Sequence, residues 1–296
     1  MHNNRLSELL ENKILLSKGN RIQRLIKLSF EILFAKILEI VALVFKRSIR
    51  IRKKTFWNED MYIVLPELVS LNICKYGFYE ENLTKMILKY MKHGMTFFDI
   101  GAHFGYFTLL GSYIVGDKGQ VHAFEPTTIT FKVLNLNVLE KSNVILNNLA
   151  VSSKSKTVLM NDYRMRYSAF NSIYCARLPN NIVSKIKPQK HEIQAISIDE
   201  YVKNNSLRPD FIKIDAESSE YEILLGMKNT IDNFHPLITI EVGDMDIEGV
   251  FKSKELIEFL KDMGYQPYEY ADGEITPHII KDESYSYDSI LFLPEE

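Results

Sequence analysis

Asp99, Gly101, His103 and Gly105 alternate with apolar residues at the end of a short apolar segment, directly before an expected helix. Gly101 permits a tight turn, and Gly105 permits close approach of the backbone to a neighbour. The pattern is not the GxGxxG of dinucleotide sites, and it lacks the Lys and Ser/Thr of a phosphate-binding loop. A close backbone surface with one carboxylate suits a phosphate-free zwitterionic ligand that carries an amine and a cationic sulfur.

Polar side chains also follow the next two apolar segments. Glu125 comes 20 residues after Gly105. A carboxylate there can accept hydrogen bonds from both hydroxyls of a ribose, as acidic residues do in related sheets. The following segment ends near Asn148, where an adenine ring would lie. Each feature alone is weak, but their order across successive segments predicts a nucleoside site.

Acidic residues crowd the ends of two later apolar segments. Asp215, Glu217 and Glu220 lie within six residues, and Glu241 ends the segment after them. Helix N-capping suits Glu220 best, because acids favour the first turn of a helix. Asp215 and Glu217 fit a functional role better, since like charges in a cleft raise one pKa toward the working range of a base. Glu241 is either a second base or a surface cap.

The elements that would position these groups follow a regular alternation from residue 95 onward. The predicted strands are 96–100, 120–124, 144–149, 210–214 and 237–242, and the predicted helices are 106–114, 128–141, 219–233 and 253–263. Short apolar strands alternating with helices predict a doubly wound, mostly parallel α/β sheet. Such sheets bind ligands at the carboxyl ends of their strands. Strands at 266–270 and 289–293 would add an antiparallel hairpin.

A polar, aromatic stretch interrupts the alternation. Residues 152–196 are interpreted as an inserted hairpin or lid, with strands at 157–161 and 192–196. Its polar side chains are candidate contacts for a polyhydroxyl substrate: Tyr167, Ser168, Asn171 and Ser172. An ordinary surface loop is the alternative interpretation of these four residues.

The N-terminal part of the chain differs in charge from the rest. Residues 1–60 hold 13 Lys or Arg and 6 Asp or Glu, whereas residues 61–296 hold 23 and 32. Ile26, Phe30, Leu33, Ile37, Ile40 and Val44 follow helical spacing, and six cations lie within residues 46–54. We therefore expect a basic amphipathic helical arm over residues 1–60 and a helical connector over residues 61–94, ahead of a domain at 95–296.

The arm has three possible partners. It can pack on its own domain or on a second subunit as a homo-oligomer contact, or it can rest on an anionic membrane surface with its cations at the headgroups. Nucleic acid is the weakest interpretation, because no recognisable nucleic-acid module accompanies the cations. Charged residues interrupt the apolar stretch, so the sequence does not predict a membrane span.

Composition sets the remaining bounds. The chain of 296 residues is 46% hydrophobic and 25% charged, which are globular proportions. Its 2 cysteines cannot form a disulfide framework, so a reducing, cytoplasmic compartment is expected. No Cys or His spacing predicts a metal site.

Taken in order, these motifs resemble the FkbM-type family of S-adenosylmethionine-dependent methyltransferases, which have a Rossmann-like class I fold. The resemblance runs from about residue 96 to residue 244 and rests on four stretches: 98–106, 123–126 with Leu134 and Asn135, 198–199, and 212–217 with Glu220 and Gly226. The family usually has Asn at the position of His103 and Gly at the position of Ser218.

The resemblance implies roles for the site residues. Asp99, Gly101, His103 and Gly105 would hold the amino-acid end of S-adenosylmethionine, with Glu125 at the ribose and Asn148 at the adenine. Asp215 and Glu217 would face the methyl group and the acceptor, one as base or orienter, with Glu241 as a second base candidate.

The family resemblance implies O-methylation. The acceptor would be a small molecule or a glycan: a sugar, a glycan or a natural product. Two other hypotheses remain: a catalytically weakened regulator that binds the cofactor, and a membrane-associated partner of a glycan-assembly complex. The expected location is cytoplasmic, with peripheral contact at the inner membrane surface as a further expectation.

Overall fold

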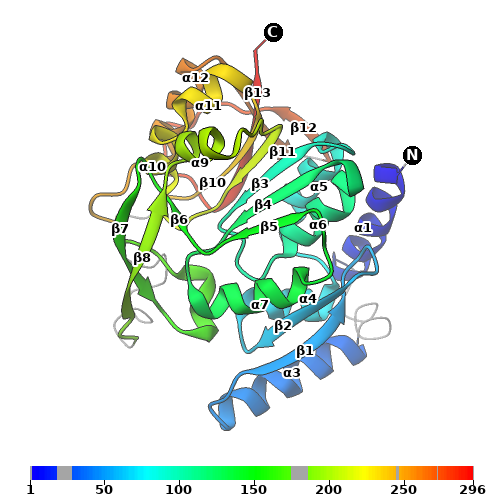
Figure 1. Cartoon of the computed structure of the whole chain (residues 1–296). Helices are drawn as coiled ribbons and strands as arrows, with labels where there is room; N and C mark the ends of the chain where they lie inside the picture. The colour runs from blue at the N-terminus through cyan, green and yellow to red at the C-terminus, as the bar shows by residue number, and fades with distance from the viewer. Residues whose placement is uncertain (1, 19–28, 175–185, 245–246, 272, 296) are drawn as a thin grey trace.

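An eight-stranded sheet forms the centre of the computed structural model, which describes residues 2–18, 29–174, 186–244, 247–271 and 273–295 (Figure 1). Its strand order is β12-β11-β13-β10-β9-β3-β4-β5. The bounds are β3 Thr96–Ile100, β4 Gln120–Phe124, β5 Val144–Asn147, β9 Phe211–Ile214, β10 Leu237–Val242, β11 Tyr265–Ala271, β12 Glu274–Pro277 and β13 Asp288–Pro294. The first five of these are parallel, and the last three add antiparallel pairs. The predicted mostly parallel sheet is confirmed.

Helices cover both faces of this sheet, as a parallel sheet requires. One apolar core contains Phe97, Val121 and Phe211 together with residues of α5 (Glu81–Tyr90), α6 (Tyr106–Val115) and α7 (Thr128–Val138). The other core contains Phe98 and Ile212. Its helices are α9 Ile198–Asn205, α10 Glu220–Leu225, α11 Lys228–Phe234 and α12 Ser253–Asp262. Alternate residues of each strand thus supply opposite cores.

The single helix predicted over residues 219–233 is wrong, because the chain forms α10 and α11 with a break at Gly226. A Cβ at Gly226 would lie 2.3 Å from the carbonyl oxygen of Ser152. Asp199 then caps the start of α11, accepting hydrogen bonds from the backbone N–H groups of Asn229 at 3.1 Å and Thr230 at 2.7 Å. The close packing at Gly226 ends α10, and the cap from Asp199 starts α11 as a separate helix.

The expected all-helical arm and connector are also corrected. Helices α1 (His2–Lys18) and α3 (Ser29–Val44) are present, but the cationic segment forms strand β1 (Ile49–Lys54). It pairs antiparallel with β2 (Asp60–Leu65), the start of the expected connector. The strand has period-two exposure: Arg50, Arg52 and Lys54 are exposed, whereas Ile51 and Lys53 between them are half-buried. None of the helices in the described part of the chain has the length and apolar character that crossing a bilayer requires.

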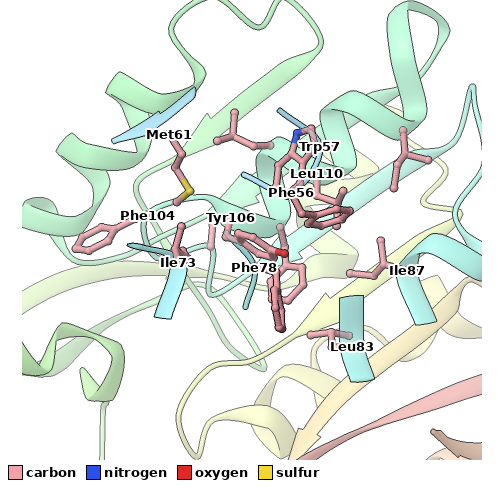
Figure 2. Close-up of a cluster of buried hydrophobic side chains, with 14 of the residues drawn as sticks. Phe56, Trp57, Met61, Ile73, Phe78, Leu83, Ile87, Phe104, Tyr106 and Leu110 are labelled. Carbon is pink, nitrogen blue, oxygen red and sulfur yellow. The ribbon is translucent and has the colours of Figure 1, made fainter. Parts of the chain in front are cut away.

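The N-terminal elements and the sheet domain share one apolar core. Figure 2 shows Trp57, from the β1–β2 turn, beside Tyr106 at the start of α6, with ring centroids 5.3 Å apart. Ile73 of α4 (Leu68–Tyr76) and Ile87 of α5 lie in the same cluster. The hairpin and α4 are therefore held against the end of the sheet where the turns after β3 and β4 lie.

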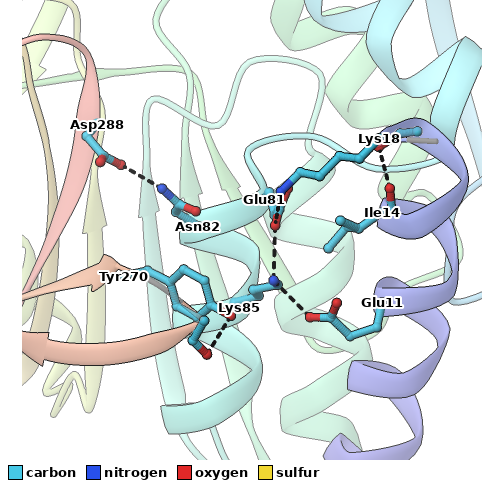
Figure 3. A network of polar contacts seen from close by, with 10 residues as sticks. Glu11, Ile14, Lys18, Glu81, Asn82, Lys85, Tyr270 and Asp288 are labelled. Carbon is cyan, nitrogen blue, oxygen red and sulfur yellow. Dashed lines mark hydrogen bonds and ion pairs between the residues drawn. The ribbon is translucent and has the colours of Figure 1, made fainter. Parts of the chain in front are cut away.

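Helix α1 is held by a polar network (Figure 3). The amine of Lys85 on α5 lies 2.8 Å from Glu11 and 3.0 Å from Glu81, and 4.6 Å from the ring centre of Tyr270 on β11. Lys18 pairs with Glu81 at 2.8 Å. These pairs join the first helix to α5 and to the far edge of the sheet.

The inserted segment is a hairpin in the described residues. Strand β7 (Lys156–Asp162) pairs antiparallel with β8 (Gln189–Ile196), and the short β6 (Ala150–Val151) completes a three-stranded sheet. A short 3-10 segment, η2 (Met165–Phe170), follows β7 and lies near α4 and α7. The insert therefore reaches the same end of the main sheet as the turns after β3 and β4.

Candidate functional site

A cavity that is partly open to solvent lies at the carboxyl ends of β3, β4 and β9. Strand β3 stands between β4 and β9, so the chain winds away from it in opposite directions. This is the switch in strand order at which doubly wound sheets bind ligands. The wall includes Gly101, His103, Glu125, Asp215, Glu217 and Glu241.

Gly101 forms the floor of the cavity where two strand ends meet. Its backbone has φ +79°, and a Cβ there would lie 1.7 Å from the carbonyl oxygen of Asp215. Its N–H donates to the carbonyl of Phe124 at 3.0 Å. No side chain fits this position, so the turn after β3 presents bare backbone to the cavity beside Asp215.

Glu125 ties the turn after β3 to the turn after β4. Its Oε1 accepts hydrogen bonds from Thr127 N at 2.9 Å and Thr130 Oγ1 at 2.6 Å, and its Oε2 accepts one from His103 N at 3.0 Å. Burial raises the pKa of Glu125 to about 7, although these bonds act in the opposite direction. Because each carboxylate oxygen has two lone pairs, Oε2 can accept one more donor from the cavity.

Lys213 is the buried cation of the site, only 2% exposed. Its amine lies 3.3 Å from Asp99 and 3.2 Å from Asp215. Asp99 is fully buried and also accepts a hydrogen bond from Thr108 Oγ1 at 2.6 Å. The two carboxylates keep the pKa of Lys213 above its usual value against the opposing effect of burial. The amine therefore joins the ends of β3 and β9 through charge.

The insert contacts the turn after β3 through His103. The ring Nε2 lies 2.8 Å from Ser168 Oγ on η2, and the ring stacks on Phe104 with centroids 3.9 Å apart. Burial, with Lys213 adding to it, lowers the pKa of His103 to about 3. The imidazole is therefore neutral near pH 7 and can donate or accept one hydrogen bond at each nitrogen.

Three carboxylates meet at the edge of the cavity. Oxygens of Glu80, Asp215 and Glu241 lie within 4.8 Å of one another. Burial and repulsion from Asp215 raise the pKa of Glu80 to about 8. The sequence predicted no metal ligands here. Carboxylates at this spacing can share a proton or a cation. The amine of Lys213 already supplies one positive charge beside Asp215.

A second hollow adjoins the first. The two share Tyr79, Glu217 and Glu241 in their walls, so the acids stand between them. The second hollow also has polar side chains from α4, α5 and β13: Asn72, Glu81, Asn82, Asp288 and Ser289. One cavity at the strand ends and a polar hollow beyond the acids give two adjacent binding spaces.

The structure brings most of the predicted site residues to this cavity. Its walls include Gly101, His103, Glu125, Asp215, Glu217, Glu241, Ser168 and Asn171. Glu220 instead accepts hydrogen bonds from Ala216 N at 3.1 Å and Ser218 N at 3.3 Å at the start of α10. Glu220 is the first residue of α10, but these N–H groups belong to the turn before the helix, so the two bonds stabilise that turn and are not the helix N-cap that the sequence favoured.

Five predicted contacts do not lie on the cavity wall. Asp99 lies beneath it, paired with Lys213. A Cβ at Gly105 would lie 2.5 Å from Leu134 Cδ1, so this glycine serves the packing of α6 on α7. Asn148 is exposed and donates to the carbonyls of Glu125 at 2.8 Å and Pro126 at 3.0 Å.

The other two belong to the insert. Ser172 Oγ donates to the carbonyl of Glu217 at 2.5 Å, which links the insert to the turn after β9. Tyr167 packs near Tyr163, with the guanidinium of Arg166 5.3 Å from its ring centre. Both residues shape the insert, whereas Ser168 and Asn171 face the cavity.

Sequence reasoning gave no role to Lys213 or Glu80. Lys213 did carry a signal, because it is the one charged residue in a strand whose other residues are Phe211, Ile212 and Ile214. Glu80 carried none: it precedes α5, far from the strand-end motifs, and has a left-handed backbone with φ 42°. Only the docking of the connector against the sheet brings it to the acids.

Ser218 occupies a backbone conformation that favours glycine. It has φ 81°, and Glu217 before it has φ 46°. We expect Ser218→Gly to raise the free energy of unfolding by about 1 kcal/mol relative to Ser218→Ala, because glycine has no Cβ to strain there. Denaturant unfolding of the two variants measures this. Equal stabilities would contradict the expected strain.

The sequence profile of the FkbM methyltransferase domain matches residues 99–267, more than half of the chain. The fold and this match define a protein of the S-adenosylmethionine-dependent methyltransferase class, with S-adenosylmethionine as the family's cofactor. In particular, the chain belongs to the FkbM methyltransferase domain family.

Solved structures are similar at low identity. A methyltransferase FkbM from Methylobacillus flagellatus is 18% identical, with 67% of this chain and 43% of that chain covered and a TM-score of 0.42. An S-adenosylmethionine-dependent O-methyltransferase from Thermotoga maritima is 12% identical, with 86% and 81% covered and a TM-score of 0.41. An Aeropyrum pernix fibrillarin with bound S-adenosyl-L-methionine is 13% identical, with 69% and 68% covered and a TM-score of 0.39.

This chain thus spans less than half of the M. flagellatus protein. No curated protein sequence matches it.

Proposed function

We propose that the protein transfers a methyl group from S-adenosylmethionine to a hydroxyl group of a sugar, glycan or related natural product. The observation that carries the proposal is the group of three carboxylates, Glu80, Asp215 and Glu241, within 4.8 Å of one another at the junction of two hollows. Methylation of a hydroxyl releases its proton, and a carboxylate with a raised pKa is suited to accept it.

The cavity at the strand ends fits the cofactor. Gly101 offers backbone without a side chain, and Glu125 has a free acceptor position for a ribose hydroxyl. Asp215 lies further along the wall, so negative charge faces the end of the cavity next to the second hollow. When bound there, S-adenosylmethionine supplies an electrophilic methyl group on a cationic sulfur.

Other residues take altered roles in this proposal. Asp99 acts through Lys213, by fixing the amine that orients Asp215. Leu149 and Ala150 line the cavity beside Asn148 and replace it as the adenine contact. Neutral His103 remains a hydrogen-bonding group for the amino-acid end, held by Ser168.

The second hollow suits a polyhydroxyl acceptor. Asn72, Asn82 and Asp288 supply amide and carboxylate groups that pair with hydroxyls, and the insert contributes Ala169 and Phe170 to the wall. An acceptor placed there would meet the methyl group at the shared wall formed by Glu217 and Glu241. Binding in two adjoining spaces fixes the reacting atoms in line, which is the main requirement of a methyl transfer.

The test measures cofactor binding and turnover separately. Calorimetry with S-adenosylmethionine is expected to give binding, weakened on the order of 10-fold in Glu125→Gln, which loses the charge but keeps one acceptor. Release of S-adenosylhomocysteine is then followed with a panel of sugars and glycans. Binding without release for any hydroxyl acceptor would contradict the proposed transfer and favour a cofactor-binding regulator.

The pH dependence tests the acid cluster. A carboxyl group accepts a proton only when ionised, so kcat/KM should rise with pH as Glu80, with its pKa raised to about 8, loses its proton. Glu80→Gln should remove this rise while cofactor affinity stays within about 3-fold. Glu258→Gln is the matched control, because Glu258 on α12 is exposed beside Lys254 and lines neither hollow. An unchanged pH profile in Glu80→Gln would exclude Glu80 from the proton transfer.

A further inference from the structure

Helix α3 buries its small residues and exposes its large ones. Ala35 and Ala42 are buried against the molecule, next to α4. On the opposite side, Phe30 is 73% exposed, Val44 is 68% exposed and Phe45 after the helix is 70% exposed. Other large apolar residues share this exposed side: Leu33, Ile37, Ile40, Val41 and Leu43. A surface helix of a soluble domain normally turns its apolar stripe inward, so this exposed stripe requires a partner.

Cations border the exposed stripe, and they lie close to it in the fold. Lys46 and Arg47 follow the helix directly, and Arg50 lies on β1. All three are exposed, and none of them pairs with a carboxylate within the described ranges. Arg52 and Lys54 extend the row along β1, where each lies within 4 Å of Asp60. Residues 46–54 hold six cations and no acid. Figure 1 shows α3 at the outer edge of the molecule, with β1 beside it.

We propose that the exposed side of α3 and the cations of residues 46–54 dock the protein on an anionic lipid bilayer. A bilayer surface combines negatively charged headgroups with an apolar interior directly beneath them. The protein presents the matching pair, an apolar stripe along α3 and cations that follow it in the chain over residues 46–54. Amphipathic helices bind at this depth with apolar side chains in the acyl boundary and Lys or Arg at the headgroups.

Charge favours a bilayer over a second copy of the chain. The unit of α3, β1 and β2, residues 29–65, holds seven Lys or Arg and four Asp or Glu, with the cations gathered at one end. A symmetric dimer through this side would bring two surfaces of the same net sign together. Negatively charged headgroups attract the cations, so electrostatic attraction and burial of the apolar stripe both favour binding to the bilayer.

Vesicle flotation of the full-length protein tests the docking without reference to activity. We expect it to float with vesicles of phosphatidylcholine and phosphatidylglycerol, and much less with phosphatidylcholine alone. The variant Lys46→Gln/Arg47→Gln/Arg50→Gln should bind the anionic vesicles on the order of 100-fold more weakly, because each cation near the surface contributes about 5-fold. Leu33→Ser/Ile37→Ser/Val44→Ser should lose binding to at least the same degree.

Matched controls change the same residue types elsewhere. Lys118→Gln/Lys154→Gln/Lys203→Gln removes three exposed cations from the sheet domain, and Leu159→Ser/Ile279→Ser removes two exposed apolar side chains. Both should float as the unchanged protein does, and all variants should keep the same circular dichroism. Equal flotation of the α3 and control variants would overturn the proposal. So would a dimer in solution that the α3 variant dissociates, with no flotation of the unchanged protein.

Discussion

Replacing Gly101 with alanine should lower the free energy of unfolding by about 3 kcal/mol or more and weaken S-adenosylmethionine binding on the order of 100-fold. The added Cβ would lie 1.7 Å from the carbonyl oxygen of Asp215, so the ends of β3 and β9 would have to separate. Backbone has little room to move there, because Gly101 N donates to Phe124 and Asp215 N donates to Ile100 at 3.1 Å. Denaturant unfolding and calorimetry with the cofactor measure the two effects.

Gly94→Ala is the matched control for Gly101→Ala. Gly94 has φ +84°, nearly the same left-handed backbone, but no heavy atom within 4 Å of the position of a Cβ. Gly94→Ala should lower the free energy of unfolding by only about 1 kcal/mol, because only the backbone conformation is strained, and it should leave cofactor binding unchanged. If the two variants were equally stable, the close approach of the strand ends would not be what requires glycine at position 101.

Lys213→Met should lower the free energy of unfolding by about 3–5 kcal/mol and abolish the proposed methyl transfer. The amine is 2% exposed and lies 3.3 Å from Asp99 and 3.2 Å from Asp215, so its loss leaves two carboxylates facing each other in a buried space. Methionine has a similar length and keeps the apolar contacts of the lysine stem. The stability loss would therefore report the missing charge rather than a cavity.

A double variant separates charge from packing. Asp99→Asn keeps an acceptor for Thr108 Oγ1 but removes the negative charge, so Lys213→Met/Asp99→Asn should be more stable than the sum of the single losses predicts, by at least about 1 kcal/mol. Lys85→Met is the control: it removes a lysine from the pairs with Glu11 and Glu81, and should leave cofactor binding unchanged. Strictly additive losses at 99 and 213 would show that the two side chains do not interact.

The sequence alone determined the order and type of the elements in the sheet domain. Strand β3 and strand β10 have the predicted bounds, Thr96–Ile100 and Leu237–Val242, because a strand buried on both faces is a continuous apolar run between turn residues. The same pattern placed Glu125 and Asp215 at strand ends, and parallel strands bring such ends to one edge of a sheet. Local sequence was sufficient wherever the periodicity and the turn residues agreed.

Local sequence was misleading where a long-range contact decides the conformation. Residues 49–54 are a strand because they pair with residues 60–65, and the predicted helix over 219–233 breaks at Gly226 because Ser152 packs against it. Neither contact has a signal in the neighbouring sequence.

The tertiary structure also determined which side chains face the cavity. Asp99 and Gly101 are two residues apart, yet one is buried against Lys213 and the other forms the cavity floor, because β3 ends at Ile100 and the left-handed backbone of Gly101 turns the chain out of the strand. Glu80 joins Asp215 and Glu241 only through the packing of α5 on the sheet. The exposed stripe of α3 is the clearest case: helical spacing predicted an apolar face, but only the packing of Ala35 and Ala42 on the molecule turned that face outward.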